Sequence, residues 1–214
     1  MINQSTLSFS APPYNIKTLY ENFDDNLELE KYLNFIKNVI LECAKKLKKD
    51  GRLIIEVADS IFTNQKYIQL AGAIQKYAVS DAKLFLETRN INFIKTKEFF
   101  ELPDHGFDVN YATSKEAHSN CHQILVFNKS KIKFQEGRII YINYGSSSEY
   151  PCPEPKEMID FIFDKYFQTG MKVLDPFMGT ANLGVSTLKK GGEFFGYEIV
   201  EKFYNTAKKK LGSI

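Results

Sequence analysis

The chain has 214 residues with 43% hydrophobic content, which is enough for one sizeable core and favours a single α/β domain over residues 1–214. Its 28 basic and 26 acidic residues nearly cancel, so composition neither favours nor excludes a nucleic-acid partner. The sequence contains no long apolar run or charged leader, and its three cysteines are scattered, so we expect a cytoplasmic protein with reduced thiols and no membrane contact.

The first predicted element is a strand over residues 5–9, where polar and apolar residues alternate. Because proline cannot donate to a strand ladder, Pro12 and Pro13 end this strand. Residues 27–48 have apolar side chains at helical spacing and predict a helix with one wide apolar face. The mostly apolar run 52–57 then predicts a buried strand.

The middle of the chain is less regular. Residues 69–79 predict a helix, and residues 83–100, rich in Phe, Ile and Thr, predict one or two strands. Residues 102–120 form a predicted irregular segment, and such long loops on a compact domain are often functional. Strands are predicted again over 123–127 and 138–143.

The last third of the chain alternates helices with strands. Helices are predicted over 155–168, 182–190 and 200–211, and strands over 171–174 and 193–197. Strands that alternate with helices imply a mostly parallel sheet. We therefore expect an α/β fold with a mostly parallel twisted sheet, helices on both faces and one antiparallel strand.

The strongest motif is V-L-D-P-F-M-G-T-A-N at residues 173–182, where a strand breaks into a turn of small residues and then a helix. A turn at the carboxyl end of a parallel strand lets backbone N–H groups and a carboxylate, here Asp175, meet a ligand. About twenty residues later, Glu198 ends the next strand, where α/β folds place an acid that binds ribose hydroxyls. Spacing alone fits either a nucleotide-like ligand or a structural corner.

The wording of this turn resembles the methyl-donor motif of DNA amino-methyltransferases, usually D-P-F-x-G-S-G, and S-A-P-P-Y-N at residues 10–15 resembles their catalytic D/S/N-P-P-Y motif. Residues 44–53 are similar to the family's R-V-L-K-P-G-G-R-L, residues 123–129 to its H-E-x-I-L-V-F-x-K, and residues 150–155 to its H-P-A-x-F-P. A catalytic motif that precedes the donor motif is typical of the permuted beta group, which contains N-4 cytosine and N-6 adenine DNA methylases.

The resemblance implies a Rossmann-like methyltransferase fold, DNA methylation and S-adenosylmethionine as the cofactor. In such enzymes, hydrogen-bond acceptors draw the hydrogens of an exocyclic amine out of the base plane. The residues implied in catalysis are Ala11, Pro12, Pro13 and Tyr14, with the Pro12 carbonyl as one acceptor and Tyr14 as the face on which a flipped base stacks. The residues implied in cofactor binding are Ser10, Asp175, Pro176, Phe177, Gly179, Thr180 and Glu198.

Three positions depart from the family pattern: Ala11, Ala181 and Asn182, the last of which stands where the family usually has threonine. Ala11 cannot accept a hydrogen bond where the family has Asp, Ser or Asn, and the loss of one such bond lowers a rate by roughly 10²–10³. Ala181 replaces the last glycine of the donor motif and adds a methyl group where backbone approaches the ligand. The first hypothesis is an active DNA methyltransferase, and the alternative is an impaired or inactive homologue that retains donor or DNA binding. A third hypothesis is a binding module unrelated to methyl transfer.

As the methylated atom, the sequence slightly favours cytosine N-4 over adenine N-6. The S-x-P-P-Y-N context and residues 64–70 and 150–155 look more like enzymes that act on cytosine, whereas adenine enzymes more often carry Asp before the prolines. The expected partner is double-stranded DNA with a flipped target base. The resemblance also admits a homodimer and a cognate restriction endonuclease.

The segment around residues 95–120 is the expected target-recognition insertion, because a loop can be shaped to one DNA sequence. Candidate contacts to the DNA backbone in and after it are Lys97, Lys115, Lys129 and Lys131, each of which also fits a solvated surface.

A second cluster in this region is formed by His118, Cys121 and His122. It fits either a zinc site or an ordinary loop that enters a strand. Because no fourth ligand stands at a suitable spacing, we expect no metal.

Overall fold

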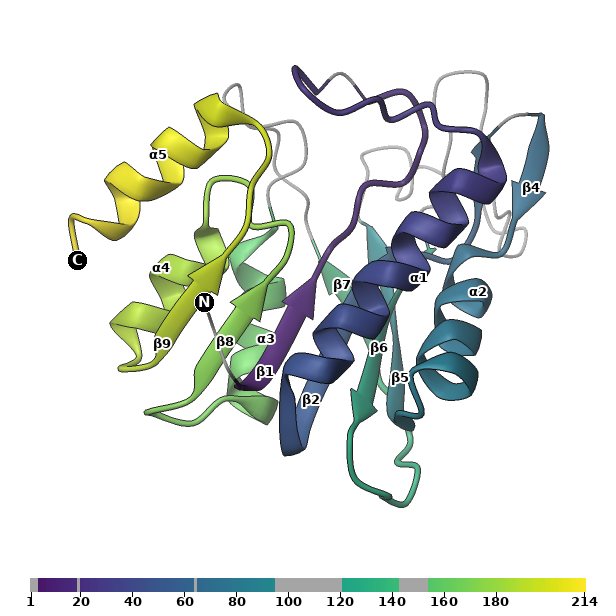
Figure 1. Cartoon of the computed structure of the whole chain (residues 1–214). Helices are drawn as coiled ribbons and strands as arrows, with labels where there is room; N and C mark the ends of the chain where they lie inside the picture. The colour runs from purple at the N-terminus through teal and green to yellow at the C-terminus, as the bar shows by residue number, and fades with distance from the viewer. Residues whose placement is uncertain (1–3, 19, 64, 95–120, 143–153) are drawn as a thin grey trace, which may run out of the picture.

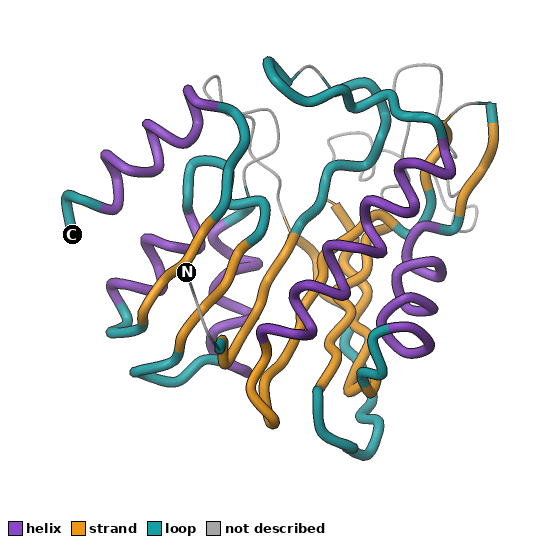
Figure 2. Tube along the Cα trace, viewed as in Figure 1, coloured by secondary structure: helices purple, strands orange, loops and turns teal. Residues whose placement is uncertain are grey.

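The structure is a computed structural model that describes residues 4–18, 20–63, 65–94, 121–142 and 154–214. Within these residues, seven strands form one mixed sheet in the order β7-β5-β6-β2-β1-β8-β9. Helices cover both faces of this sheet, as Figure 1 and the simpler trace in Figure 2 show. The expected α/β fold with a mostly parallel twisted sheet is confirmed.

The parallel half of the sheet is built around β1 (Ser5–Ser10). This strand pairs in parallel with β2 (Leu47–Ala58) on one side and with β8 (Lys172–Asp175) on the other. Beyond β8, the parallel strand β9 (Glu193–Gly196) is the outermost strand on this side of the sheet. The carboxyl ends of these four strands therefore lie along one edge of the sheet.

The other half of this seven-stranded sheet contains the sheet's single antiparallel strand among the described residues. This strand is β6 (Cys121–Asn128), which runs antiparallel to β2 and to β5 (Phe85–Ile94). The outermost strand, β7 (Ile139–Ile142), is parallel to β5. Residues 124–127 of β6 are all buried because helices cover both faces of the sheet here.

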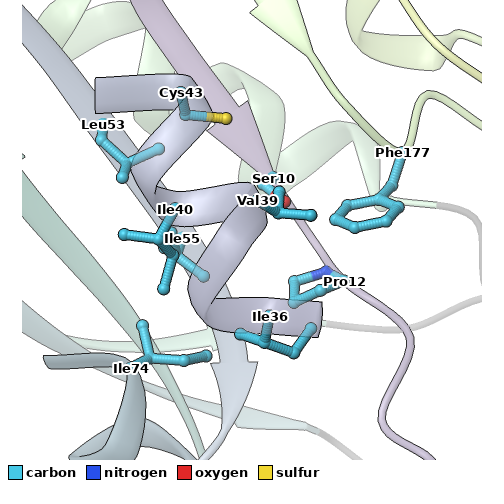
Figure 3. Close-up of a pocket in the computed structure, with 10 residues that line it drawn as sticks. All are labelled: Ser10, Pro12, Ile36, Val39, Ile40, Cys43, Leu53, Ile55, Ile74 and Phe177. Carbon is cyan, nitrogen blue, oxygen red and sulfur yellow. The ribbon is translucent and has the colours of Figure 1, made fainter. Parts of the chain in front are cut away.

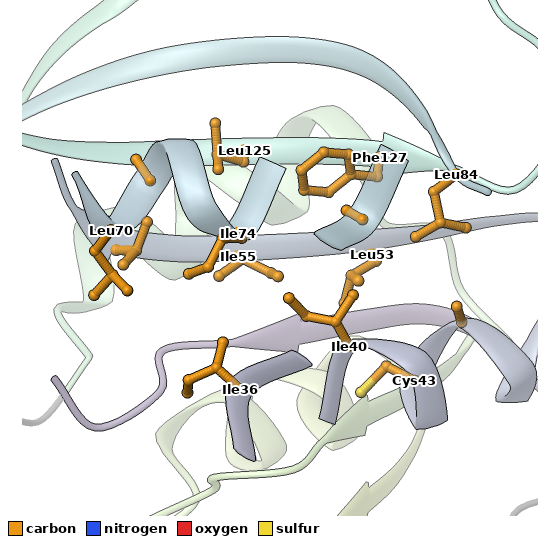
Figure 4. Close-up of a cluster of buried hydrophobic side chains, with 14 of the residues drawn as sticks. Ile36, Ile40, Cys43, Leu53, Ile55, Leu70, Ile74, Leu84, Leu125 and Phe127 are labelled. Atoms are coloured by element: carbon orange, nitrogen blue, oxygen red, sulfur yellow. The ribbon is translucent and has the colours of Figure 1, made fainter. Parts of the chain in front are cut away.

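One face of the sheet is covered by α1 (Leu29–Lys46), α2 (Leu70–Lys76) and the π-helical turn η1 (Tyr77–Asp81). The apolar residues of α1 recur every three or four positions, so one stripe of the helix is buried against the sheet. Figure 4 shows this cluster, whose larger members are Ile36, Ile40, Leu53, Ile55, Leu70, Ile74, Leu84, Leu125 and Phe127.

The opposite face is covered by α3 (Lys156–Tyr166) and α4 (Asn182–Lys189), and α5 (Glu201–Leu211) packs against α4. The core on this side joins α3 to strands β1, β2 and β6. Its largest members include Leu7, Phe9, Ile54, Ile124, Val126, Ile162 and Phe163. None of the helices within the described ranges is long and apolar enough to cross a membrane.

Helix α1 gives way to a strand earlier than the sequence predicts. The helix ends at Lys46 and β2 begins at once at Leu47, whereas the prediction placed the strand at 52–57. The reason is tertiary, because Leu47 is buried and pairs with Ser5 of β1. The helix predicted over 69–79 is likewise divided into α2 and η1.

A short hairpin, β3 (Ile61–Thr63) and β4 (Lys66–Ile68), was not predicted. Its two strands of three residues are too short to show a period-two pattern. The expected target-recognition insertion around 95–120 lies outside the described residues.

Candidate functional site

The two sequence motifs follow neighbouring strands. β1 ends at Ser10 and β8 ends at Asp175, and the two strands pair in parallel through Leu7 with Val173 and Ser8 with Leu174. Both motifs therefore begin at the same edge of the sheet, where ligands of open α/β folds bind.

A cavity of about 440 Å³ lies at this edge. Its size falls within the range of small-molecule sites, roughly 300–1,000 Å³. The walls come from the segment after β1, from α1 and from the turns after β8 and β9, and consist of Ala11, Pro13, Tyr20, Phe23, Phe35, Pro176, Phe177, Tyr197, Glu198, Ile199 and Val200. We call this the donor cavity from here on.

A row of four aromatic rings forms one wall of the donor cavity. The ring of Phe177 lies edge-on to Phe35 at 5.9 Å, Phe35 lies 5.7 Å from Phe23, and Phe23 lies 6.2 Å from Tyr20. Such a wall favours planar and cationic groups. The sequence motif identified Phe177 alone, because the other three lie in a loop and a helix whose path the sequence does not reveal.

Asp175 is buried at the end of β8, next in the chain to the cavity residue Pro176, and is not itself among the residues that line the donor cavity. Its Oδ1 accepts the backbone N–H of Phe177 at 3.0 Å, and its Oδ2 has no hydrogen-bond partner within the described residues. The pKa of Asp175 is raised to about 7, mainly by burial and in smaller part by the charge of Glu198, while the hydrogen bond from the Phe177 N–H lowers it. A buried acceptor without a partner is unfavourable, so the site is suited to a ligand that carries a donor or a positive charge.

Glu198 is the residue with a carboxyl group among those that line the donor cavity. Its Oε1 accepts the backbone N–H of Val200 at 2.8 Å, which fixes the side chain just before α5 begins. Glu154, which precedes α3, is also buried, and burial together with the charge of Asp175 raises its pKa well above the usual range.

The turn between β8 and α4 contains two residues in the left-handed region, Gly179 with φ 50° and Ala181 with φ 61°. Gly179 and Thr180 are buried in the turn and are not among the residues that line the donor cavity. Ala181 is also buried and belongs to a small apolar cluster with Met178 and Ala207. The Ala181 side chain thus packs into the protein core.

The catalytic motif divides between two environments. Ala11 and Pro13 line the donor cavity. Ser10 and Pro12 line instead a small void of about 10 Å³ between α1 and the sheet, among apolar side chains such as Ile36 and Val39 (Figure 3). The structure therefore does not bring Ser10 to the donor cavity, although the sequence placed it among the cofactor-binding residues.

The backbone of the motif is held in place from α1. The buried hydroxyl of Tyr32 donates to the carbonyl of Pro13 at 2.9 Å, and burial raises the pKa of Tyr32. Asn15, the last residue of the motif, is buried and exchanges two hydrogen bonds with the backbone of Leu27. Asn15 therefore has a structural role that closes the segment between β1 and α1.

Asp25 completes this closure. Its carboxylate accepts the backbone N–H groups of Asn15 at 2.8 Å, Ile16 at 3.1 Å and Thr18 at 3.0 Å. These bonds fold residues 15–28 back on themselves and so carry Tyr20 and Phe23 to the donor cavity.

Tyr14 points to a different part of the sheet. Its hydroxyl donates to Glu56 Oε2 of β2 at 3.1 Å, and His122 of β6 is hydrogen-bonded through Nδ1 to Glu56 Oε1. His122 thus pairs with a carboxylate across two strands. No group of three His, Cys, Asp or Glu that could hold a metal ion exists in the described part of the chain, and His118 lies outside it.

The four lysines predicted to contact the DNA backbone lie in different places. Lys129 lies at the opposite edge of the sheet, where its Nζ donates to the carbonyls of Ala44 and Leu47 at 2.8 Å each. Lys129 therefore caps the end of α1. Lys131 is exposed, and Lys97 and Lys115 lie outside the described residues.

Comparison with known proteins yields consistent matches. The model of a family described as DNA methylase, N6_N4_Mtase, matches residues 6–209. The Type II methyltransferase M.HpaI of Haemophilus parainfluenzae is 26% identical over 99% of this chain and 69% of its own length.

Two solved structures share the fold. The PvuII DNA methyltransferase (cytosine-N4-specific) has a TM-score of 0.73 at 14% identity, covering 97% of this chain and 79% of that one. The M1.HpyAVI–SAM complex has a TM-score of 0.65 at 15% identity, covering 97% of this chain and 89% of that one.

Proposed function

Because this chain belongs to the N6_N4_Mtase family of DNA methylases, we propose that the donor cavity binds S-adenosylmethionine and that the protein methylates an exocyclic amine in double-stranded DNA. Family membership also makes the hypothesis of an unrelated binding module wrong. The observation that supports the proposal best is the donor cavity itself, which joins Ala11 and Pro13 of one motif to Pro176 and Phe177 of the other.

The residues of the donor cavity fit this cofactor. When bound, S-adenosylmethionine supplies an activated methyl group on a sulfonium cation. The aromatic wall and the carboxyl group of Glu198 favour a positively charged ligand, and the buried carboxyl group of Asp175 directly precedes the cavity residues Pro176 and Phe177 in the chain. Glu198, which the Val200 N–H holds at the cavity wall, is suited to accept hydrogen bonds from ribose hydroxyls.

The catalytic motif is suited to hold the acceptor base. The ring of Tyr14 offers a face on which a flipped base stacks, and the Pro12 carbonyl serves as an acceptor for the amine hydrogens. Because Tyr32 fixes the neighbouring Pro13 carbonyl, the motif needs little rearrangement when the base arrives.

Ala11 favours a second candidate function, an impaired homologue that still binds the donor or DNA. Ala11 lines the donor cavity at the point where the two motifs meet, and its methyl group cannot accept a hydrogen bond. The amino-acid sequence of the S-A-P-P-Y-N motif supports cytosine N-4 as the target rather than adenine N-6.

Substitution of Ala11 by Ser or Asp tests the two candidates. The side chain adjoins a cavity of about 440 Å³, so a larger residue has space. We expect transfer of tritiated methyl groups to unmethylated DNA to rise by roughly 10²–10³ because an acceptor is restored. Ala11→Val adds bulk without an acceptor and is the matched control, in which the rate should not rise.

Calorimetric titration with S-adenosylmethionine should give the same affinity for the parent and for Ala11→Ser. If Ala11→Ser and Ala11→Asp bind the donor but methylate no faster than the parent, the missing acceptor is not the only defect. Failure of all variants to bind the donor would overturn the assignment of the cavity. Mass spectrometry of nucleosides from the treated DNA decides the base, and N-6 methyladenine as the product would contradict the cytosine preference.

A further inference from the structure

A buried carboxylate and a buried imidazole lie next to Tyr14 on two strands of the sheet. Glu56 is 2% exposed and His122 is 3% exposed. They belong to the adjacent antiparallel strands β2 and β6, where Ala58 pairs with His122 and Glu56 pairs with Ile124. Since paired residues share a face and Glu56 and Ala58 are two positions apart, Glu56 and His122 lie on the same face of the sheet.

The three side chains form one hydrogen-bonded group. Glu56 accepts from the Tyr14 hydroxyl through Oε2 at 3.1 Å and from His122 Nδ1 through Oε1. The Tyr14 hydroxyl also lies 3.4 Å from His122 Nδ1, and the two rings meet edge to face with centroids 5.7 Å apart. The ring of Tyr14 is therefore restrained at its hydroxyl end by two strands of the rigid sheet.

The other end of Tyr14 is restrained as well. The preceding carbonyl, that of Pro13, accepts from Tyr32, and the following residue, Asn15, is bound to Leu27. A tyrosine that is fixed both at its backbone and at its hydroxyl keeps one ring orientation.

Stability alone does not account for such a group. A buried pair of polar side chains is weak evidence for stability, because apolar residues of similar volume in its place are often neutral or stabilising. On the proposed function, Tyr14 is the residue that meets the flipped base. We propose that Glu56 and His122 are positioning residues that hold the Tyr14 ring in the orientation required for stacking on the target base. This inference rests on the proposed function.

The contact itself can be tested without DNA. The chain has three histidines, so the ring-nitrogen NMR signals of His122 can be assigned by their loss in His122→Asn. Tyr14→Phe, which removes the hydroxyl alone, should shift these signals. Tyr67→Phe is the matched control, because the ring of Tyr67 packs at a tilt against Phe62 in the separate hairpin β3–β4, and this variant should leave the signals unchanged. Unchanged His122 signals in Tyr14→Phe would overturn the proposal.

The positioning role is tested by kinetics on unmethylated DNA, with the faster of the parent and Ala11→Ser as the background. Tyr14→Phe, Glu56→Gln and His122→Asn should each lower kcat/KM for DNA about tenfold, the effect of one lost hydrogen bond, at an unchanged donor Kd. Because the group acts as a unit, the double variant Tyr14→Phe/His122→Asn should be no slower than either single variant.

A paired apolar replacement separates positioning from folding. Glu56→Met/His122→Phe should keep the thermal midpoint of the parent but show the same tenfold loss on DNA. An unchanged kcat/KM in this variant, or additive losses in the double variant, would leave Glu56 and His122 with a structural role alone. If no background protein methylates or binds DNA, the proposed function fails, and the positioning role fails with it.

Discussion

Asp175 links the donor site to pH. Burial raises the pKa of this carboxyl from 3.8 to about 7, so between these values the folded chain binds more protons than the unfolded chain. The free energy of unfolding that Asp175 contributes is therefore fully present below about pH 4 and is lost as the pH rises to about 7. Above about pH 7, Asp175 is ionised in the folded protein, and the folded state is then less stable than it would be with this carboxyl protonated.

A cationic donor reverses this balance, because it favours the ionised form of Asp175. We expect the affinity for S-adenosylmethionine to increase from about pH 6 to about pH 8, and binding near pH 6 to release protons. Calorimetry in buffers of different ionisation enthalpy measures both effects. Asp175→Asn, which cannot titrate, should bind more weakly and with a flatter pH profile. An affinity of the parent that stays constant over this range would show that the donor does not contact this carboxyl.

At the scale of elements, the segment from residue 15 to residue 28 depends on one carboxylate. Asp25 accepts three backbone N–H groups there and is itself buried. Asp25→Ala leaves these donors without a partner and should lower the free energy of unfolding by about 2–3 kcal/mol. It should also weaken donor binding, since Tyr20 and Phe23 would leave the cavity wall.

Denaturant unfolding and calorimetry measure the two effects of Asp25→Ala. Asp24→Ala is the matched control, because Asp24 is exposed and accepts the backbone N–H of Asn26, so we expect a change within about 0.5 kcal/mol. Equal losses in both variants would mean that the segment is not held by Asp25.

The same segment shows where sequence reasoning reaches its limit. The positions of Asp175 and Glu198 at the carboxyl edge of the sheet were predictable, because Asp175 ends β8 and Glu198 follows β9, while their roles in binding stay predictions. Tyr20 and Phe23 were not, because their place depends on bonds from Asp25 to backbone groups, which leave no pattern in the sequence. Glu56 gave a visible signal, a lone carboxylate in an apolar strand, but its partner His122 follows only from the register of β2 and β6.

At the scale of the whole molecule, the two edges of the sheet differ in role. The donor cavity and the catalytic motif occupy the carboxyl edge, whereas Lys129 at the opposite edge joins β6 to the end of α1. Lys129→Ala removes two charge-assisted bonds to helix carbonyls and should cost about 1–3 kcal/mol, with no loss of DNA affinity. Thermal unfolding and DNA titration measure these effects, with exposed Lys131→Ala as the control. Weaker DNA binding at unchanged stability would show that Lys129 contacts DNA phosphate and does not cap α1.

The pairing of β1 with β8 also sets the order of events during biosynthesis. Thr6 and Lys172, which meet between these strands, are 166 residues apart in the chain. As the chain leaves the ribosome, β1 can pair with β2 early, but its other edge stays open until β8 has been translated. An open strand edge invites pairing with other chains, so this interval is the point at which aggregation threatens. Because the donor cavity is lined both by the segment after β1 and by the turns after β8 and β9, its two sides can meet only after β8 and β9 have been translated.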